Sequence, residues 1–171
     1  IREMYKSGLI DFQLHTHSHF SVINKIEIES FFTEKDRQKK ELSREMKNIY
    51  KRDETEDYPV FKKRGETAVR GYKITAEFIE KYEELLLKYK MLEITKKHEK
   101  LKTAVENELS EYIKEYSYEE YKERVLKEIL TNKEEIEKNL DKKAWYLANP
   151  WGHKSKELVE ILKECGIKGM I

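Results

Sequence analysis

The stretch AWYLANPWGHKSKELVEILKECGIKGMI, residues 144–171, decides the fold. Its first five residues are apolar or aromatic, which favours a strand. NPWG cannot continue a strand ladder, because proline lacks an N–H and glycine favours a turn. A helix is predicted to follow, with Ser155 as its N-cap and Gly166 at its end, before KGMI begins a second strand. Short links between strand, helix and strand indicate a parallel βαβ unit.

A second informative stretch lies near the start of the chain. IREMYKS is predicted to be a helix that ends at Gly8, and LIDFQL, residues 9–14, alternates apolar and polar side chains as a strand does. Three of the five histidines follow at every second position in HTHSH, residues 15–19. They therefore lie at the C-terminal end of the predicted strand, where α/β folds build their sites.

These histidines favour a metal site. If the chain stays extended, His15, His17 and His19 project to one side; if it turns after Thr16, only some of them converge. Either way, two imidazoles can bind one ion of the zinc or late transition-metal type. With a carboxylate as third ligand, an open position would hold a water of lowered pKa. The alternatives to a metal site are a chance cluster of surface histidines and a proton-responsive patch.

Composition sets wider bounds. The chain has 171 residues, a size that suits one ordinary domain, with 40% charged and 38% apolar residues. Its net charge of +1 gives no overall field that would attract nucleic acid or an acidic membrane. Cys165 is the single cysteine, so no internal disulfide can form. No apolar run is long enough for a membrane span or a signal segment.

The middle of the chain, roughly 28–141, is dense in Lys, Glu and Tyr and contains two glycines and one proline, which predicts long helices. Capping residues and apolar stripes predict four of them. They are expected over about 33–51, 75–89, 97–115 and 117–140. YPVFKKRGETAVRGYKI, residues 58–74, is the exception, because β-forming residues flank a glycine-containing turn and predict a short hairpin.

Taken together, these segments resemble the polysaccharide deacetylase family, also called the NodB-homology domain. HTHSH looks like that family's second motif, His-[Ser/Thr]-x-x-His, after a helix, a glycine and a strand. His15 and His19 match the two metal-binding histidines, Thr16 matches the hydroxyl position, and His17 falls at a variable position. AWYLANPWG looks like the third motif, and the segment 117–143 is similar to the helix between the motifs. The resemblance covers about 70 of the 171 residues.

The resemblance implies an α/β fold that is part of a distorted (β/α) barrel, formed by 1–32 and 117–171, with a mainly helical insertion over 33–116. It implies a divalent metal, usually zinc, and removal of N-acetyl or sometimes O-acetyl groups from a carbohydrate polymer. The turn of Asn149, Pro150, Trp151 and Gly152 would line the substrate groove. It also implies a location outside the cytoplasm or at the cell envelope.

The chain departs from the family pattern in three ways. The motif that carries the metal-binding aspartate and the catalytic-base aspartate is expected to precede residue 1. The motif with the catalytic-acid histidine is expected to follow residue 171. Ala148 stands where the third motif often has an arginine. We therefore expect this chain to contain two of three metal ligands, no identifiable base and no activity by itself.

Two alternatives remain open. DFQLHTHSHFS also looks like the opening motif of the polymerase-and-histidinol-phosphatase phosphoesterases, in which His15 and His17 would be the ligands and a phosphate ester the substrate. The other alternative is not enzymatic: the tyrosine-rich helices would form an arm for self-association or for docking on a partner, since a helix with one apolar face must bury it.

Overall fold

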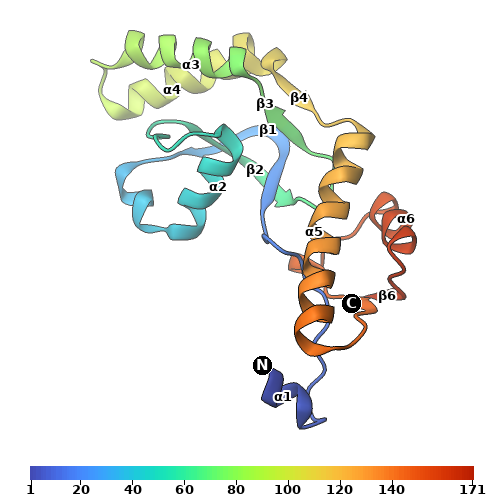
Figure 1. Cartoon of the computed structure of the whole chain (residues 1–171). Helices are drawn as coiled ribbons and strands as arrows, with labels where there is room; N and C mark the ends of the chain where they lie inside the picture. The colour runs from blue at the N-terminus through green and yellow to red at the C-terminus, as the bar shows by residue number, and fades with distance from the viewer. The chain divides into compact units, whose positions relative to one another are not determined.

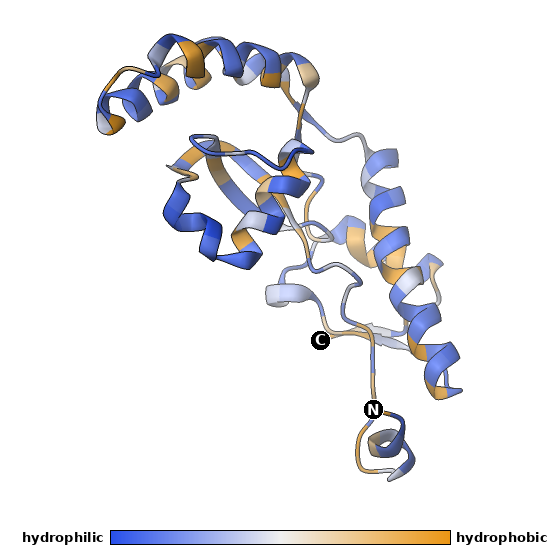
Figure 2. Ribbon diagram, turned by 60° about the vertical axis from the view of Figure 1, so that its left-hand side comes forward, coloured by the Kyte–Doolittle hydropathy of each residue, from blue (hydrophilic) through white to orange (hydrophobic).

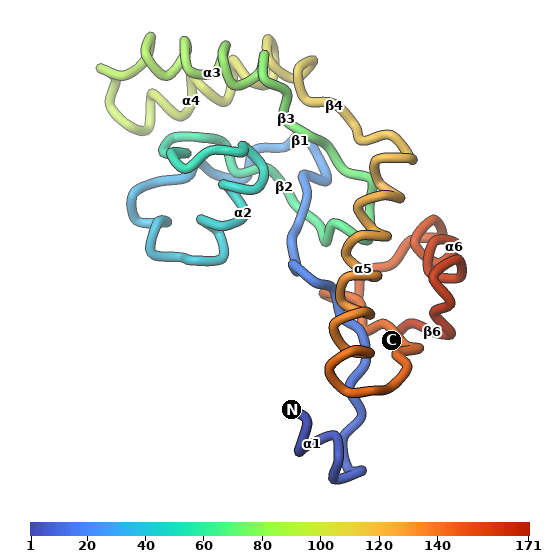
Figure 3. Tube along the Cα trace, viewed as in Figure 1, coloured from blue at the N-terminus to red at the C-terminus, as the bar shows by residue number.

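The computed structural model describes all 171 residues and shows a mixed α/β chain that divides into two compact units (Figure 1). The first unit comprises Ile1–Phe20, Gly65–Arg70 and Ser117–Ile171. The second unit comprises Ser21–Arg64 and Gly71–Tyr116. Along the trace in Figure 3, the chain therefore enters the second unit twice and returns each time to the first.

The first unit contains the predicted βαβ arrangement. β5 (Tyr146–Leu147) and β6 (Gly169–Met170) pair in parallel, and α6 (Lys156–Glu164) connects them. Leu14 adds a parallel bridge to Leu147. Helices α1 (Arg2–Lys6) and α5 (Tyr118–Leu140) complete the unit. Its buried apolar core is formed by Leu14, Tyr121, Val125, Ile129, Ala144, Leu147, Leu158, Ile161, Leu162 and Ile167.

Local sequence explains the ends of these helices. Ser117 and Glu120 form the predicted capping box at the start of α5. Ser155 caps α6 by accepting a hydrogen bond from the Leu158 N–H. Gly8 and Gly166 follow α1 and α6 with φ of 74° and 70°, the left-handed conformation that glycine tolerates. The predicted caps and terminators of the first unit are thus confirmed.

The predicted strand over 9–14 is wrong in its extent. Only Leu14 pairs: its N–H donates to the Tyr146 carbonyl at 3.0 Å, and its carbonyl accepts from the Ala148 N–H at 2.8 Å. Gln13 contacts the neighbouring strand through its side chain, whose oxygen accepts hydrogen bonds from the N–H groups of Trp145 and Tyr146. A side chain thus replaces backbone pairing just before the bridge. Both sheets of the chain are open.

The second unit is built on a four-stranded sheet in the order β2-β1-β3-β4. β1 (Ser21–Phe31) and β3 (Tyr72–Ile74) are antiparallel, as are β3 and β4 (Ile113–Glu115). β2 (Pro59–Gly65) lies on the other side of β1. The predicted hairpin over 58–74 is therefore wrong: β2 and β3 form, but β1 separates them.

The helices of the second unit are shorter than predicted. The helix expected over 33–51 is broken into a 3-10 turn, η1 (Glu34–Gln38), and α2 (Lys40–Tyr50). α3 (Ala76–Tyr89) forms as expected, with the Thr75 side chain as its N-cap. The helix expected over 97–115 is α4 (Ile94–Ala104), followed by a π-helical turn (Val105–Leu109), a 3-10 turn (Ser110–Tyr112) and β4.

Aromatic side chains fill the core of the second unit. The rings of Tyr50 and Tyr58 meet edge to face with centroids 4.8 Å apart, and those of Phe78 and Tyr82 stack at 5.6 Å. The hydroxyls of two buried tyrosines are satisfied by backbone, since Tyr50 donates to Pro59 O and Tyr82 to Asp57 O, each at 2.6 Å. Tyr50 and Tyr82 are thus core residues, while Tyr89 and Tyr112 are partly buried and pack against this core.

The two compact units have other boundaries than the expected barrel portion and insertion. The second unit begins at Ser21, not at residue 33, and contains the four-stranded sheet as well as helices. Its longest strand, β1, lies wholly within 1–32, the segment expected to belong to the barrel. Conversely, Gly65–Arg70 lies inside the expected insertion but packs in the first unit. That short segment contributes to the candidate site described next.

Candidate functional site

His15 is held at the end of the Leu14 bridge by two hydrogen bonds. Its backbone N–H donates to Asn132 Oδ1 at 3.1 Å, and its ring Nδ1 lies 2.5 Å from Ala148 O. A carbonyl oxygen only accepts, so Nδ1 must carry the proton. In the neutral tautomer with this proton, Nε2 carries the lone pair and is the nitrogen that can bind a metal. A backbone carbonyl that fixes the tautomer in this way is typical of metal-binding histidines.

The chain turns after Thr16 and brings His19 back to His15. His19 has φ of 57°, in the left-handed region that a non-glycine residue seldom adopts. The ring centroids of His15 and His19 lie 5.0 Å apart, with an interplanar angle of 33°. His17 is directed elsewhere, since its Nδ1 lies 3.5 Å from Glu135 Oε2. The structure therefore brings together two of the three histidines.

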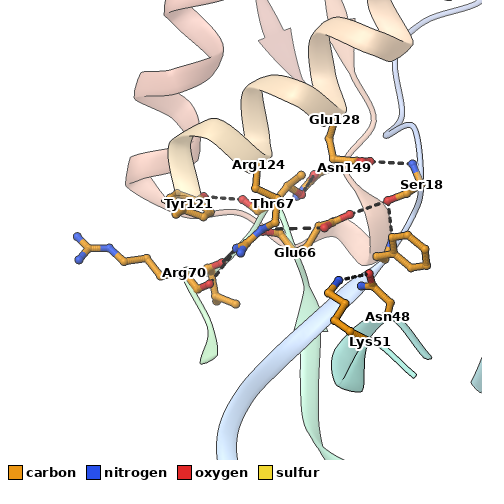
Figure 4. Close-up of polar contacts among 12 residues, drawn as sticks. Ser18, Asn48, Lys51, Glu66, Thr67, Arg70, Tyr121, Arg124, Glu128 and Asn149 are labelled. Atoms are coloured by element: carbon orange, nitrogen blue, oxygen red, sulfur yellow. Dashed lines mark hydrogen bonds and ion pairs between the residues drawn. The ribbon is translucent and has the colours of Figure 1, made fainter. Parts of the chain in front are cut away.

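Two buried carboxylates hold the turn between His17 and His19. The Ser18 N–H donates to Glu128 Oε2, and the Ser18 hydroxyl donates to Glu66 Oε1, each at 2.7 Å (Figure 4). Burial raises the pKa of the Glu66 carboxyl, and the neighbouring Glu128 adds to the shift. Because the serine is held through both its backbone and its side chain, the turn that places His19 is fixed. We call Ser18, Glu66 and Glu128 the serine clamp.

Arg124 secures the short segment that supplies Glu66. Its Nη2 donates to the carbonyls of Glu66, Val69 and Arg70 at 3.0, 3.1 and 2.8 Å, and its Nε lies 4.0 Å from Glu66 Oε2 (Figure 4). The guanidinium thus ties Gly65–Arg70 to α5 within the first unit. It also offsets part of the cost of burying the Glu66 carboxylate.

The NPWG turn divides into a buried and an exposed half. Asn149 is buried, and its Oδ1 accepts from the Thr67 hydroxyl at 3.0 Å, while Pro150 is buried beside it. Trp151 and Gly152 are exposed, with φ of 56° and 65°, and 52% of the Trp151 surface is accessible. Asn149 and Pro150 therefore support the turn, and Trp151 presents an indole that can contact a ligand.

The Trp151 indole lies beside the histidine pair. Its ring centroid is 4.3 Å from that of His19, with an interplanar angle of 55°. Gly65 makes room for it, because a Cβ at that position would sit 3.1 Å from Trp151 Cε3. The Trp151 indole and the His15 imidazole thus both lie next to the His19 ring. Aromatic faces in such a position commonly stack on ring-shaped ligands.

The possible metal ligands at this site are two imidazoles, those of His15 and His19, without a carboxylate beside them. No group of three or more His, Cys, Asp or Glu side chains is arranged to hold a metal ion. The two carboxylates that contact the turn, Glu66 and Glu128, each accept a hydrogen bond from Ser18. Thr16, at the hydroxyl position of the motif, is buried with its Oγ1 unpaired in the protein. Imidazole nitrogens are among the donors that zinc accepts.

Sequence reasoning missed Glu66, Arg124, Glu128 and Asn132. Glu128 left a signal, because it falls on the same helical face as the buried Val125 and Ile129. A carboxylate on an apolar face needs a buried partner. Glu66 left none, since its loop reads as an ordinary polar turn.

Comparisons of this chain with protein-family models, with curated proteins and with solved structures find no match. In the structure itself, no helix combines the length and the apolar character needed to cross a membrane.

Proposed function

We propose that this chain is part of a metal-dependent hydrolase that removes acetyl groups, mainly N-acetyl groups, from a carbohydrate polymer. The first unit would be a portion of a distorted (β/α) barrel of the polysaccharide deacetylase type, outside the cytoplasm or at the cell envelope. The proposal rests on the resemblance of HTHSH and the NPWG turn to that family's motifs, together with the geometry around the histidines.

The observation that carries the proposal is the inequality of the three histidines. The family motif assigns metal binding to its first and last histidines, and the rings of His15 and His19 lie together while His17 faces Glu135. The His15 Nδ1 contact with Ala148 O leaves Nε2 as the donor atom. A phosphoesterase of the rival class would use His15 and His17, and the contact of His17 with Glu135 favours the first assignment.

The roles of the residues follow from this arrangement. His15 and His19 would hold the ion, which when bound polarises a water and the acetyl carbonyl. Trp151 would contact a sugar ring, and the buried Asn149 and Pro150 would hold Trp151 and Gly152 in position. The resemblance implies that the third ligand and the base are aspartates outside these 171 residues, so hydrolysis would need them supplied.

Metal binding tests the proposal without requiring activity. We expect zinc titration by isothermal calorimetry to show one site in the 171-residue chain, lost in His15→Ala and in His19→Ala and retained in His17→Ala. His17 is the matched control, because it is a histidine of the same turn. Loss of zinc binding with His17→Ala but not with His19→Ala would overturn the assignment and favour the phosphoesterase alternative.

A deacetylation assay supplies a second test, in which we expect a negative result. We expect no release of acetate from a chitooligosaccharide by this chain alone, because no base is identified among its residues. Deacetylation by the chain alone that persists in His15→Ala would refute the proposed mechanism. Acetate release that depends on His15 and His19 would instead show that the catalytic base lies within these residues.

A further inference from the structure

Four large apolar side chains are exposed where α3 turns into α4. The accessible fractions are 69% for Leu87, 88% for Met91, 40% for Leu92 and 50% for Ile94. We call these four residues the α3–α4 tip; Figure 2 shows hydrophobic residues at this turn. The earlier part of α3 differs, since Phe78 and Tyr82 are fully buried in the core. Large apolar side chains gathered on a surface commonly mark a binding site.

Lysines outnumber acidic residues around the tip, where Glu93 is the one acidic residue between Leu87 and Ile94. Lys88, Lys90 and Lys96 are exposed beside it. Residues 87–102 contain six lysines and two glutamates, so this stretch carries +4 in a chain whose net charge is +1. Two lysines deeper in the stretch have acidic partners, since Lys97 pairs with Asp57 and Lys102 lies 3.9 Å from Glu106. An anionic lipid surface attracts lysines, and exposed apolar side chains beside them can insert into it.

We propose that the α3–α4 tip binds the surface of an anionic lipid bilayer, with the side chains of Met91 and Leu92 inserted among the headgroups. The surrounding lysines would contact lipid phosphates. A bilayer accommodates projecting side chains without needing a complementary shape. Met91 suits this role, because its thioether side chain is flexible and apolar.

Other occupants fit the tip less well. A second copy of the chain would bring its own +4 stretch against the first, and like charges repel. Four side chains are also few for a stable protein interface, which buries more than about 1,000 Å². The self-association expected for the helical segment therefore has no support at this tip, and a bilayer uses both its apolar residues and its charge.

Vesicle co-sedimentation of the full 171-residue chain tests the proposal. We expect binding to vesicles of equal phosphatidylcholine and phosphatidylglycerol, weakening as salt is added, and little binding to phosphatidylcholine alone. Met91→Ser should weaken binding to the mixed vesicles by about tenfold, from the loss of one buried apolar side chain. Leu9→Ser is the matched control, because Leu9 is also 88% exposed but lies in the first unit.

The charge requirement has its own control. The triple variant Lys88→Gln, Lys90→Gln and Lys96→Gln should weaken binding by about fivefold per lysine removed. A second triple variant makes the same change in net charge within the first unit, at the exposed residues Lys127, Lys138 and Lys156, and should bind nearly as the parent does.

Three results would overturn the proposal. One is absence of binding to the mixed vesicles by the folded parent chain, with folding checked by circular dichroism. Another is an equal loss of binding in the control variants. The third is a dimer detected by light scattering that Met91→Ser dissociates, which would assign the tip to a second copy of the chain.

Discussion

Glu128→Ala removes the acceptor that holds the Ser18 backbone within the serine clamp. The hydrogen bond is 2.7 Å long, and the Glu128 side chain is buried. A hydrogen bond to a charged group contributes about 1.5–3 kcal/mol, and the abandoned N–H keeps its desolvation cost. Alanine is a somewhat better helix former than glutamate, which offsets a few tenths of a kcal/mol. We expect the free energy of unfolding to fall by about 2 kcal/mol.

The same change should reach the histidine pair. Ser18 immediately precedes His19, whose φ of 57° is an unfavourable conformation that surrounding contacts must maintain. With one side of the clamp gone, the turn relaxes and His19 spends less time beside His15. Residues that orient metal ligands typically change metal affinity by about 10–100-fold when mutated. We therefore expect zinc affinity to fall by at least about tenfold.

Glu135→Ala is the matched control. Glu135 lies on the same helix, α5, and its carboxylate is 3.5 Å from His17 Nδ1, but this pair is exposed to solvent. Even a fully charged pair at an exposed position contributes only about 0–1 kcal/mol. We expect this variant to lose at most about 1 kcal/mol of stability and to keep the zinc affinity of the parent chain.

Urea denaturation and zinc titration of the parent and the two variants give both quantities. A Glu128→Ala variant that matches Glu135→Ala in stability and in zinc affinity would refute the clamp. A loss of stability with unchanged zinc affinity, measured below the urea transition, would show that Glu128 supports α5 but does not position His19. Rescue of zinc affinity in Glu128→Gln, which keeps an acceptor oxygen, would support the positioning role.

Three further predictions concern the same unit. The raised pKa of Glu66 means that the folded chain binds a proton more readily than the unfolded chain, so the parent should gain stability relative to Glu66→Gln as pH falls from 7 toward the ordinary carboxyl pKa of 4.5, as urea midpoints would show. Gly65→Ala should displace the Trp151 indole and cost about 1 kcal/mol, detectable as a change in tryptophan emission. Ser117→Ala should destabilise the chain by about 1 kcal/mol through loss of the α5 capping box, measured by urea denaturation.

The parts of the fold that sequence predicted are those specified by local chemistry. Ser117, Ser155 and Thr75 are N-caps in the structure as expected, because a side-chain oxygen that satisfies helix N–H groups acts within three residues. The parallel pairing of β5 and β6 was predicted because a short helical crossover leaves few other arrangements. Each of these inferences needed only one short stretch of sequence.

The missed strand β1 shows where that approach fails. VINKIEIESF alternates well enough around Ile26 and Ile28 to indicate a strand. No element is nevertheless predicted for this stretch, which lies between the predicted strand over 9–14 and the first predicted helix at about 33. β1 lies between β2 and β3, which would pair directly in a hairpin. This strand order depends on contacts between segments that are distant in sequence. Strand propensity depends on packing partners, which local composition does not specify.

The candidate site divides in the same way. The histidine motif and the exposed Trp151 are local features, and sequence identified both. Glu66 and Glu128 are separated from Ser18 by 48 and 110 residues, so no local pattern could predict that they meet there. Glu128 could have been questioned as a charge on an apolar helix face, but its partner could not have been named.

The alternation of histidines in HTHSH is itself uninformative about which of them act together. On an extended strand His15, His17 and His19 would be equivalent, and any pair could be argued. The equivalence ends at Ser18, because the carboxylates that hold its N–H and its hydroxyl require the chain to turn there. Once it turns, His17 is directed to Glu135 and His19 returns to His15. Residues from two distant segments thus decide which imidazoles form the pair, and the spacing of the histidines does not.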